Sequence, residues 1–333
     1  MANSHRRRYP AHMLKHRLLL GSLFIVVVIV LIYADAWLAG AVDAQRLPSL
    51  TCLGLPGCGG AVILVVLGVL VALGTRELHH LFRAAGHAPL LAWPIVVNLG
   101  LLLIAFHAGN MATGLAACAS CAPCTDALDA PALTSAWLAL ALMGAAGLVA
   151  CRRRTEGAIG AIAATLLMIV YLGLLPQYLL RLRYADPAAG PWLLLYFLGV
   201  VKFCDIGAYF TGRAVGRHKL IEWLSPKKTV EGLAGGIAAS VLLAVLVPML
   251  VRHLAPASSS AAAFPAPARA VLFGVAMALI GQAGDLLESL FKRDARAKDS
   301  AKMIPAFGGV LDILDSPLLA APVACWILLQ SPV

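Results

Sequence analysis

Long apolar stretches, separated by short polar segments, recur along the whole chain. They lie near residues 18–37, 56–73, 90–109, 133–150, 157–180, 191–211, 233–251, 268–290 and 316–330. Each approaches the ~20 apolar residues that one helix needs to cross a bilayer. Because a backbone in lipid must satisfy its hydrogen bonds internally, these stretches are expected to be helices. The sequence therefore predicts an all-α, polytopic membrane helical bundle with about nine transmembrane helices.

The composition excludes an ordinary soluble domain. Of the 333 residues, 61% are hydrophobic and only 13% are charged, whereas soluble domains carry about 25% charged residues. The N-terminus, with Arg6, Arg7, Arg8 and Lys15 before an apolar run from Leu18, resembles a signal peptide. No small-residue cleavage site follows it, so we interpret the run as a retained first transmembrane helix.

The basic residues predict an orientation in the membrane. With the N-terminus inside, 20 of the 26 Lys and Arg fall in cytoplasmic segments and five in external ones, with Lys202 in a span. This asymmetry is what the positive-inside rule requires, and it places the C-terminus outside. The net charge of +10 is then explained by topology. The sequence lacks the interleaved aromatic and basic residues that would indicate a nucleic-acid partner.

Four cysteines fall in segments predicted to be external, and a fifth lies close to one of them. Cys118, Cys121 and Cys124 have a spacing that resembles a metal or iron–sulfur site, Cys52 lies in another external segment, and Cys58 lies near it. No fourth ligand is near the triplet, and its loop is rich in small residues. A disulfide, or a role as small apolar side chains, is therefore the simpler interpretation.

Ionisable residues inside one predicted span mark a first candidate region. Lys202 and Asp205 are three residues apart, so they share a helix face. Charged groups within a membrane usually face a polar cavity or each other. The pair is therefore either part of a polar site wall or a structural ion pair.

The segment that follows is basic and rich in hydroxyls. It contains Ser225, Lys227, Lys228 and Thr229, with glycines a few residues further on. Lysines supply charge to a phosphate, and glycines let a backbone approach it closely. The P-loop motif is absent. A plain positive-inside loop is the alternative interpretation.

The densest polar region spans the end of the eighth predicted helix and the start of the ninth. Asp285, Glu288 and Lys292 follow i, i+3, i+7 spacing and share one helix face, and Asp312 follows a Gly-Gly pair that lets the chain fold back. Carboxylates without Cys or His suit a hard cation such as Mg²⁺. Acids beside bases at a membrane surface indicate metal-assisted phosphoryl or nucleotidyl transfer. Solvated salt bridges are the alternative.

At these residues the chain resembles the phosphatidate cytidylyltransferases, also called CDP-diacylglycerol synthases. The residues that match the family signature are Ser289, Lys292, Arg293, Lys298, Asp299, Pro305, Gly308, Gly309, Asp312 and Asp315. The upstream runs that begin at Asp205 and Ser225 match further family elements. The clear match covers about 200–316. Phe307 stands where the family has His, and Ile313 where it has Arg, which puts substrate detail in doubt more than the reaction type.

The resemblance implies transfer of CMP from CTP to phosphatidate, giving CDP-diacylglycerol and pyrophosphate, with Mg²⁺ and room for a second, monovalent cation such as K⁺. Asp285, Asp312 and Lys292 would be catalytic, and Asp285 and Asp312 would hold the metal. The residues expected to bind substrate are Asp205, Ser225, Lys227, Lys228, Thr229, Arg293, Lys298, Asp299, Gly308 and Gly309. We expect residues 1–190 to form the first five spans and residues 191–333 to form the catalytic region.

Two other functions fit parts of the pattern. A CTP-dependent lipid kinase of similar build would transfer a γ-phosphoryl group to a lipid alcohol instead. A transporter would use Lys202 and Asp205 as an ion relay, but the inverted repeats common in transporters are missing. We expect the protein in the bacterial inner (plasma) membrane with its site facing the cytoplasm. The oligomeric state is left open, a homodimer among the options.

Overall fold

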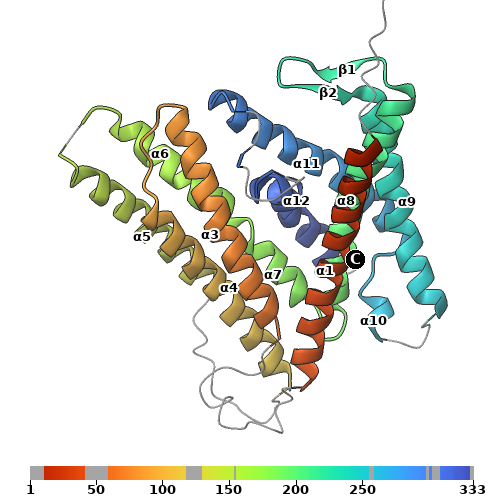
Figure 1. Ribbon diagram of the computed structural model, residues 1–333. Helices are drawn as coiled ribbons and strands as arrows, with labels where there is room; N and C mark the ends of the chain where they lie inside the picture. The colour runs from red at the N-terminus through yellow and green to blue at the C-terminus, as the bar shows by residue number, and fades with distance from the viewer. Residues whose placement is uncertain are drawn as a thin grey trace, which may run out of the picture.

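The chain folds into a bundle of long helices with one small hairpin (Figure 1). A computed structural model describes residues 11–41, 59–117, 130–153, 155–254, 259–297, 300–301 and 308–330. In chain order the elements are α1 (Ala11–Ala41), α3 (Ala61–Ala84), α4 (Ala92–Ala117), α5 (Ala130–Ala150), α6 (Ala158–Ile169), η1 (Val170–Leu174), α7 (Gln177–Arg183), α8 (Gly190–Val215), β1 (Lys219–Ile221), β2 (Ser225–Thr229), α9 (Val230–Leu254), α10 (Ser259–Ala262), α11 (Pro267–Asp294) and α12 (Leu311–Leu329).

Eight helical segments among the described residues are long and apolar enough to cross a membrane, where α6, η1 and α7 count as one. Within α1 a shorter apolar helical stretch, Ile25–Ala39, is also present. The prediction of a polytopic helical membrane protein is therefore confirmed. The count of nine crossings stays a prediction, because it depends on α1.

Helix α3 extends well beyond the apolar stretch predicted at 56–73. It begins at Ala61 and continues to Ala84. Its last turns are polar, but Thr75, Glu77 and His79 are buried against other helices and do not face lipid. Hydropathy alone ended this helix too early, because its polar residues are covered by protein.

Glycines let α8 and α9 pack with their backbones almost in contact. A Cβ atom at Gly207 would lie 2.8 Å from the Gly235 carbonyl oxygen, and one at Gly236 would lie 2.9 Å from the Cys204 carbonyl oxygen. Such small-residue contacts are typical of helix pairs in membranes. Gly235 and Gly236, which the sequence associated with phosphate, therefore serve helix packing.

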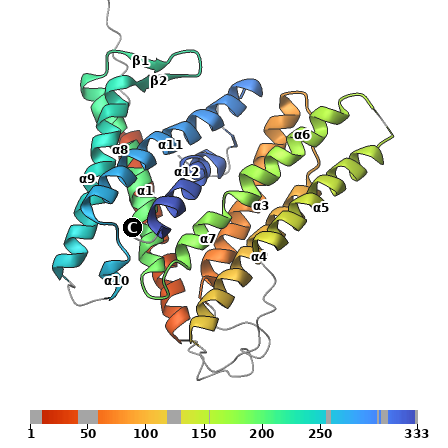
Figure 2. The same ribbon diagram turned by 180° about the vertical axis from the view of Figure 1, so that it is seen from behind.

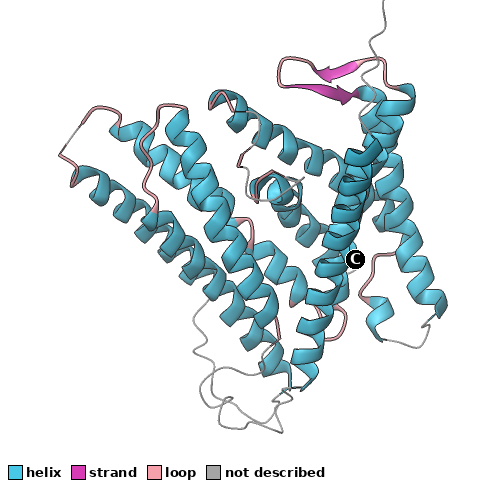
Figure 3. Ribbon diagram, viewed as in Figure 1, coloured by secondary structure: helices cyan, strands magenta, loops and turns pink. Residues whose placement is uncertain are grey.

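A two-stranded antiparallel hairpin interrupts the helical architecture between α8 and α9 (Figure 3). Lys219 pairs with Thr229, and Ile221 pairs with Ser225. The sequence predicted only a basic loop here. The hairpin fixes the lysines of β2 in position over the bundle, and its tip carries the exposed Trp223.

One apolar core joins the first and last thirds of the chain. It includes Leu78 of α3, Leu172 of η1, Phe197 of α8, Phe273 of α11 and Leu318 of α12, all fully buried. Helices α11 and α12 lie in the middle, between α3–α6 on one side and α8 and α9 on the other, as both views show (Figures 1 and 2). The two parts that the sequence divides at residue 190 thus pack around a shared centre.

A buried ion pair ties three helices together away from the hairpin. The Arg183 guanidinium at the end of α7 contacts the Asp35 carboxylate of α1, and neither side chain is more than 3% exposed. Asp35 also accepts hydrogen bonds from the backbone N–H groups of Gly60, Val62 and Ile63 at the start of α3. The Asp35 carboxylate therefore caps the start of α3 and neutralises the charge of Arg183 at the end of α7.

Candidate active site

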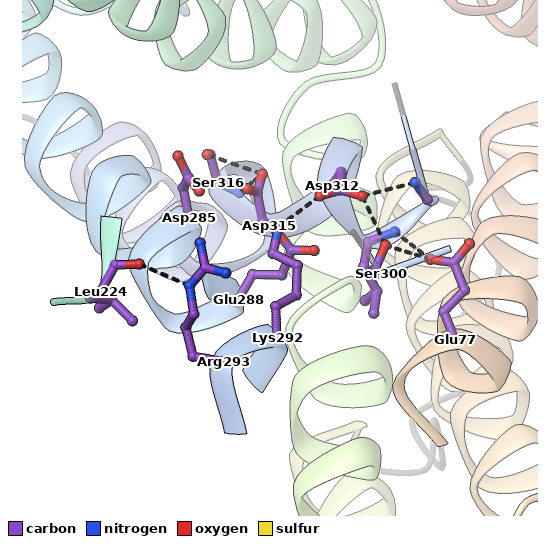
Figure 4. A network of polar contacts seen from close by, with 12 residues as sticks. Glu77, Leu224, Asp285, Glu288, Lys292, Arg293, Ser300, Asp312, Asp315 and Ser316 are labelled. Carbon is purple, nitrogen blue, oxygen red and sulfur yellow. Dashed lines mark hydrogen bonds and ion pairs between the residues drawn. The ribbon is translucent and has the colours of Figure 1, made fainter. Parts of the chain in front are cut away.

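Three carboxylates from two helices meet in the middle of the bundle (Figure 4). Asp285 and Glu288 lie one turn apart on α11, and Asp315 lies on α12; one oxygen of each lies within 4.8 Å of the others. Glu288 is 1% exposed and Asp315 is 5% exposed. A side chain at Gly284 would collide with the Asp315 carbonyl oxygen, so glycine is what permits this close approach. We call these three residues the acidic group.

Lys292 connects the acidic group to Asp312. Its Nζ donates to Glu288 Oε2 at 2.7 Å and to Asp312 Oδ1 at 2.8 Å. The lysine lies one turn after Glu288 on α11, while Asp312 lies in the first turn of α12. The face predicted from the spacing of Asp285, Glu288 and Lys292 is therefore present, and Asp312 does fold back toward it.

The other Asp312 oxygen is held by the segment before α12. Oδ2 accepts from Ser300 Oγ at 2.8 Å and from the Gly309 backbone N–H at 2.8 Å. Gly308 has a φ of +91°, a left-handed conformation that glycine adopts without strain. The Gly-Gly pair thus turns the chain so that its backbone can reach Asp312.

The hairpin brings further cations to the acidic group. Lys228 Nζ forms an ion pair with Asp285 Oδ2 at 2.7 Å. Arg293 of α11 donates from Nε to the Leu224 carbonyl oxygen at the hairpin turn, at 3.3 Å. Lys228, predicted to bind substrate, and Lys292, predicted to be catalytic, therefore contact carboxylates directly, while Arg293 and Lys227 are exposed beside them.

Two other predicted substrate-binding residues of this hairpin are placed differently. Thr229 is buried, and its hydroxyl accepts from the Gly232 backbone N–H at 3.1 Å, as a capping residue does at a helix start. Ser225 is half-buried at the start of β2.

The Lys202–Asp205 pair lies on α8, facing α11. The two charges are 3.7 Å apart, and both side chains are about one-third exposed. Gln282 of α11 donates to Asp205 Oδ1 at 3.3 Å. The ion pair that the sequence allowed is thus formed, and Gln282 connects it to the helix that carries the acidic group.

Some of the predicted residues lie outside the described part of the chain. They are Lys298, Asp299, Pro305 and Phe307 of the family signature, and the cysteines Cys52, Cys58, Cys118, Cys121 and Cys124. Their predicted roles stay predictions.

Two buried polar residues near the site escaped the sequence reasoning. Glu77 of α3 accepts backbone hydrogen bonds from Val310 and Leu311. Tyr171, in the π-helical turn η1, is 2% exposed, and its hydroxyl has no hydrogen-bond partner among the described residues. Its ring packs edge-on against Phe291 of α11, with the ring centroids 5.9 Å apart. Glu77 stands in a polar segment after a predicted span, so neither it nor Tyr171 carried a signal in the sequence.

The arrangement suits a reaction between phosphate groups. Carboxylate oxygens are the ligands that hard divalent cations prefer, and lysine and arginine neutralise phosphate oxygens. Carboxylates and cationic side chains both occur here, within one turn of each other on α11 and on the adjoining hairpin. The electrostatics therefore favour a cation and an anionic substrate together.

Comparison with known proteins agrees with this chemistry. Phosphatidate cytidylyltransferase of Chlamydia pneumoniae is 31% identical over 263 residues, which are 78% of this chain and 79% of that protein. The enzyme of the same name from Synechocystis is 31% identical over 293 residues, 79% of this chain and 87% of that protein. That of Haemophilus influenzae is 40% identical over 147 residues, 43% of this chain and 49% of that protein.

The family profile extends the match beyond the C-terminal third on which the sequence motifs lie. The profile described as the Cytidylyltransferase family matches residues 49–331. That range includes α3, and with it Glu77, as well as the hairpin, α11 and α12. The chain therefore belongs to the cytidylyltransferase family.

Proposed function

We propose that the protein is a phosphatidate cytidylyltransferase, which transfers CMP from CTP to phosphatidate and releases pyrophosphate. The observation that carries the proposal is the acidic group with Lys228 and Lys292 in direct contact with it, in a chain that belongs to the cytidylyltransferase family. The names of the relatives from Chlamydia pneumoniae and Synechocystis supply the substrate.

The reaction joins two anions. A phosphatidate phosphate oxygen attacks the α-phosphorus of CTP; the new P–O bond forms as the bond from the α-phosphorus to the oxygen of the β-phosphate breaks. The attacking phosphate is already ionised, so no general base is required. The protein must therefore supply positive charge that neutralises the phosphates, and it must align the attacking oxygen with the α-phosphorus. Lys227, Lys228, Lys292, Arg293 and Lys298 are the cations that we assign to this role.

The acidic group fits a divalent cation, which we propose is Mg²⁺. Glu288 Oε1 is buried and has no hydrogen-bond partner among the described residues. A buried carboxylate oxygen without a partner is costly, and a cation would satisfy it. Asp285, Glu288 and Asp315 would hold the ion. Asp312, the other metal ligand predicted from the sequence, lies outside this group and contacts Lys292, so it would become a ligand only when Lys292 moves away. When bound, Mg²⁺ would offset charge on the phosphates and the leaving pyrophosphate.

In this proposal Lys202 and Asp205 line the side of the site that α8 forms. Gly308 and Gly309 would bind substrate through backbone groups close to Asp312. A monovalent cation such as K⁺ beside Mg²⁺ stays part of the proposal. A homodimer also stays a prediction, which light scattering of the detergent-purified protein measures.

We infer that the site faces the cytoplasm of a bacterial inner membrane, with nine crossings, the N-terminus inside and the C-terminus outside. The distribution of Lys and Arg supports this orientation. The hairpin and the end of α11, which carry much of that charge, lie at the same end of the bundle (Figure 1). CTP is a cytoplasmic nucleotide, so this face is where the substrate would arrive.

The position of a radiolabel in CTP tests the reaction. Purified protein is supplied with Mg²⁺, with CTP labelled at either the α- or the γ-phosphorus, and with either phosphatidate or diacylglycerol as the lipid. We expect α-label in the lipid product and γ-label in pyrophosphate. Transfer of γ-label to a lipid alcohol would instead establish a CTP-dependent lipid kinase, and uptake of solute by proteoliposomes without CTP turnover would establish a transporter.

A further inference from the structure

Helix α12, which carries Asp312 and Asp315, is capped by a residue from the other end of the chain. Glu77 of α3 accepts from the Val310 backbone N–H at 2.9 Å through Oε1 and from the Leu311 N–H at 3.0 Å through Oε2. The start of α12 has no side-chain cap of its own. The first N–H groups of a helix need such partners, and here a distant helix supplies them.

Glu77 is also connected to Asp312 through one hydroxyl. Ser300 Oγ lies 3.3 Å from Glu77 Oε2 and 2.8 Å from Asp312 Oδ2. It has a single hydrogen, and the shorter distance indicates that it donates to Asp312. From there contacts continue to Lys292 and Glu288 (Figure 4). Glu77 thus lies at one end of a chain of polar contacts that reaches the acidic group.

The Glu77 side chain is buried and closely surrounded by protein atoms. Glu77 is 3% exposed, and among the described residues no Lys, Arg or His forms an ion pair with it. Its charge faces helix N–H groups, which favour an anion at that end of a helix. A Cβ atom at Gly309 would lie 2.5 Å from Glu77 Oε2. The second glycine of the Gly-Gly pair therefore makes room for this carboxylate.

We propose that Glu77 is a positioning residue for the catalytic centre: it fixes the start of α12 so that Asp312 and Asp315 face α11 at the separation that the metal and Lys292 require. The inference rests on the proposed function, because it concerns the same centre. Glu77 would not touch the substrate. It would act through the helix that it caps.

A helix cap without a catalytic consequence is the competing interpretation, and metal affinity separates the two. A plain cap would lower the melting temperature equally at every Mg²⁺ concentration. A positioning residue would also change how the acids hold the ion. Residues that orient metal ligands typically affect metal affinity or activity by roughly 10- to 100-fold.

The experiment compares Glu77→Gln with the wild-type protein. Glutamine keeps the volume but turns an amide NH₂ toward backbone N–H groups. Two quantities are measured: the Mg²⁺ concentration that gives half of the metal-induced rise in melting temperature, with no nucleotide present, and kcat and KM for CTP. We expect the half-saturating Mg²⁺ concentration to rise about tenfold or more and kcat to fall by a similar factor, with little change in KM.

Glu156→Gln is the matched control, because Glu156 is an exposed acid before α6, and it should match the wild type in both quantities. If Glu77→Gln does not fold, Glu77→Asp, which keeps the charge and shortens the side chain, is subjected to the same two measurements. A folded variant with wild-type Mg²⁺ dependence and kcat would overturn the inference. Failure of the proposed function would appear separately, as absence of α-label transfer by the wild-type protein.

Discussion

The acidic residues of the site differ in their partners. Asp285 and Glu288 each contact a lysine, whereas Asp315 accepts from the backbone N–H and hydroxyl of Ser316. Asp312 contacts Lys292, Ser300 and Gly309 at once. Removing the charge of any one of them therefore changes a different set of contacts, so single substitutions can be distinguished by more than lost activity.

Asp285→Asn and Asp312→Asn should each reduce turnover by about 100-fold or more, the usual effect of losing one stabiliser of transition-state charge, near ~3 kcal/mol. Both keep the side-chain volume, so the helices should still assemble. Turnover and the Mg²⁺ dependence of the rate measure the effect.

Asp294→Asn is the control for both. Asp294 lies at the end of α11, the helix that carries Asp285, but is exposed, and its substitution should be nearly silent. Wild-type activity of Asp285→Asn or Asp312→Asn at unchanged Mg²⁺ dependence would remove that residue from the metal assignment.

Tyr171→Phe deletes a buried hydroxyl that has no partner among the described residues. If a ligand of the site satisfies that hydroxyl, kcat/KM should fall about tenfold, the worth of one hydrogen bond near ~1.4 kcal/mol. The melting temperature of the ligand-free protein should not fall, because an unpaired buried group is removed. Tyr33→Phe, at an exposed position, is the control. A less stable but fully active Tyr171→Phe variant would refute the prediction.

Contacts along one helix could be predicted from the sequence, and contacts between distant segments could not. The spacing of Asp285, Glu288 and Lys292 places them on one face of any helix, so their proximity followed directly. Glu77 contacts residues more than 200 positions later. No local pattern encodes such a pairing, because it depends on how α3 packs against α12.

At the scale of the elements, the buried ion pair of α1 and α7 makes the bundle sensitive to a single substitution. Arg183→Met should lower stability by about 3 kcal/mol, because it leaves the Asp35 charge buried with only backbone partners. Thermal unfolding in detergent measures the loss.

Arg181→Met is the control, because Arg181 lies on the same short helix but is exposed. This substitution should change the melting temperature little. Because Asp35 and Arg183 contact each other, the double variant Asp35→Asn, Arg183→Met should lose less than the sum of the single losses. Full additivity would show that the two side chains do not stabilise each other.

The hairpin and the π-helical turn were beyond sequence reasoning for different reasons. The strands have three and five residues, and β2 reads Ser-Pro-Lys-Lys-Thr without apolar alternation. Its placement involves contacts with distant elements, such as that of Lys228 with Asp285. The turn η1 lies in a continuous apolar stretch, where hydropathy predicts a helix but not its local winding.

For the whole molecule, the orientation in the membrane is the principal untested prediction. A reporter fused after Val333 should be exposed outside the cell. Cys151, a free and exposed thiol at the end of α5, should react with an impermeant thiol reagent only from the cytoplasmic side. The labelling is done after Cys52, Cys58, Cys118, Cys121 and Cys124 are replaced by Ser. Labelling of Cys151 in intact cells would reverse the orientation.

In the proposed site, the lysines that contact the acids would make the binding of nucleotide and metal interdependent. A nucleotide that drew Lys228 and Lys292 to its phosphates would leave Asp285 and Glu288 without counter-charge, and a cation held by those carboxylates would release the ammonium groups. Each ligand would thereby remove the electrostatic penalty of the other. Such coupling is reciprocal by thermodynamic necessity. CTP and its divalent cation should therefore enter as one nearly neutralised complex, while either alone competes against the protein's own internal charges.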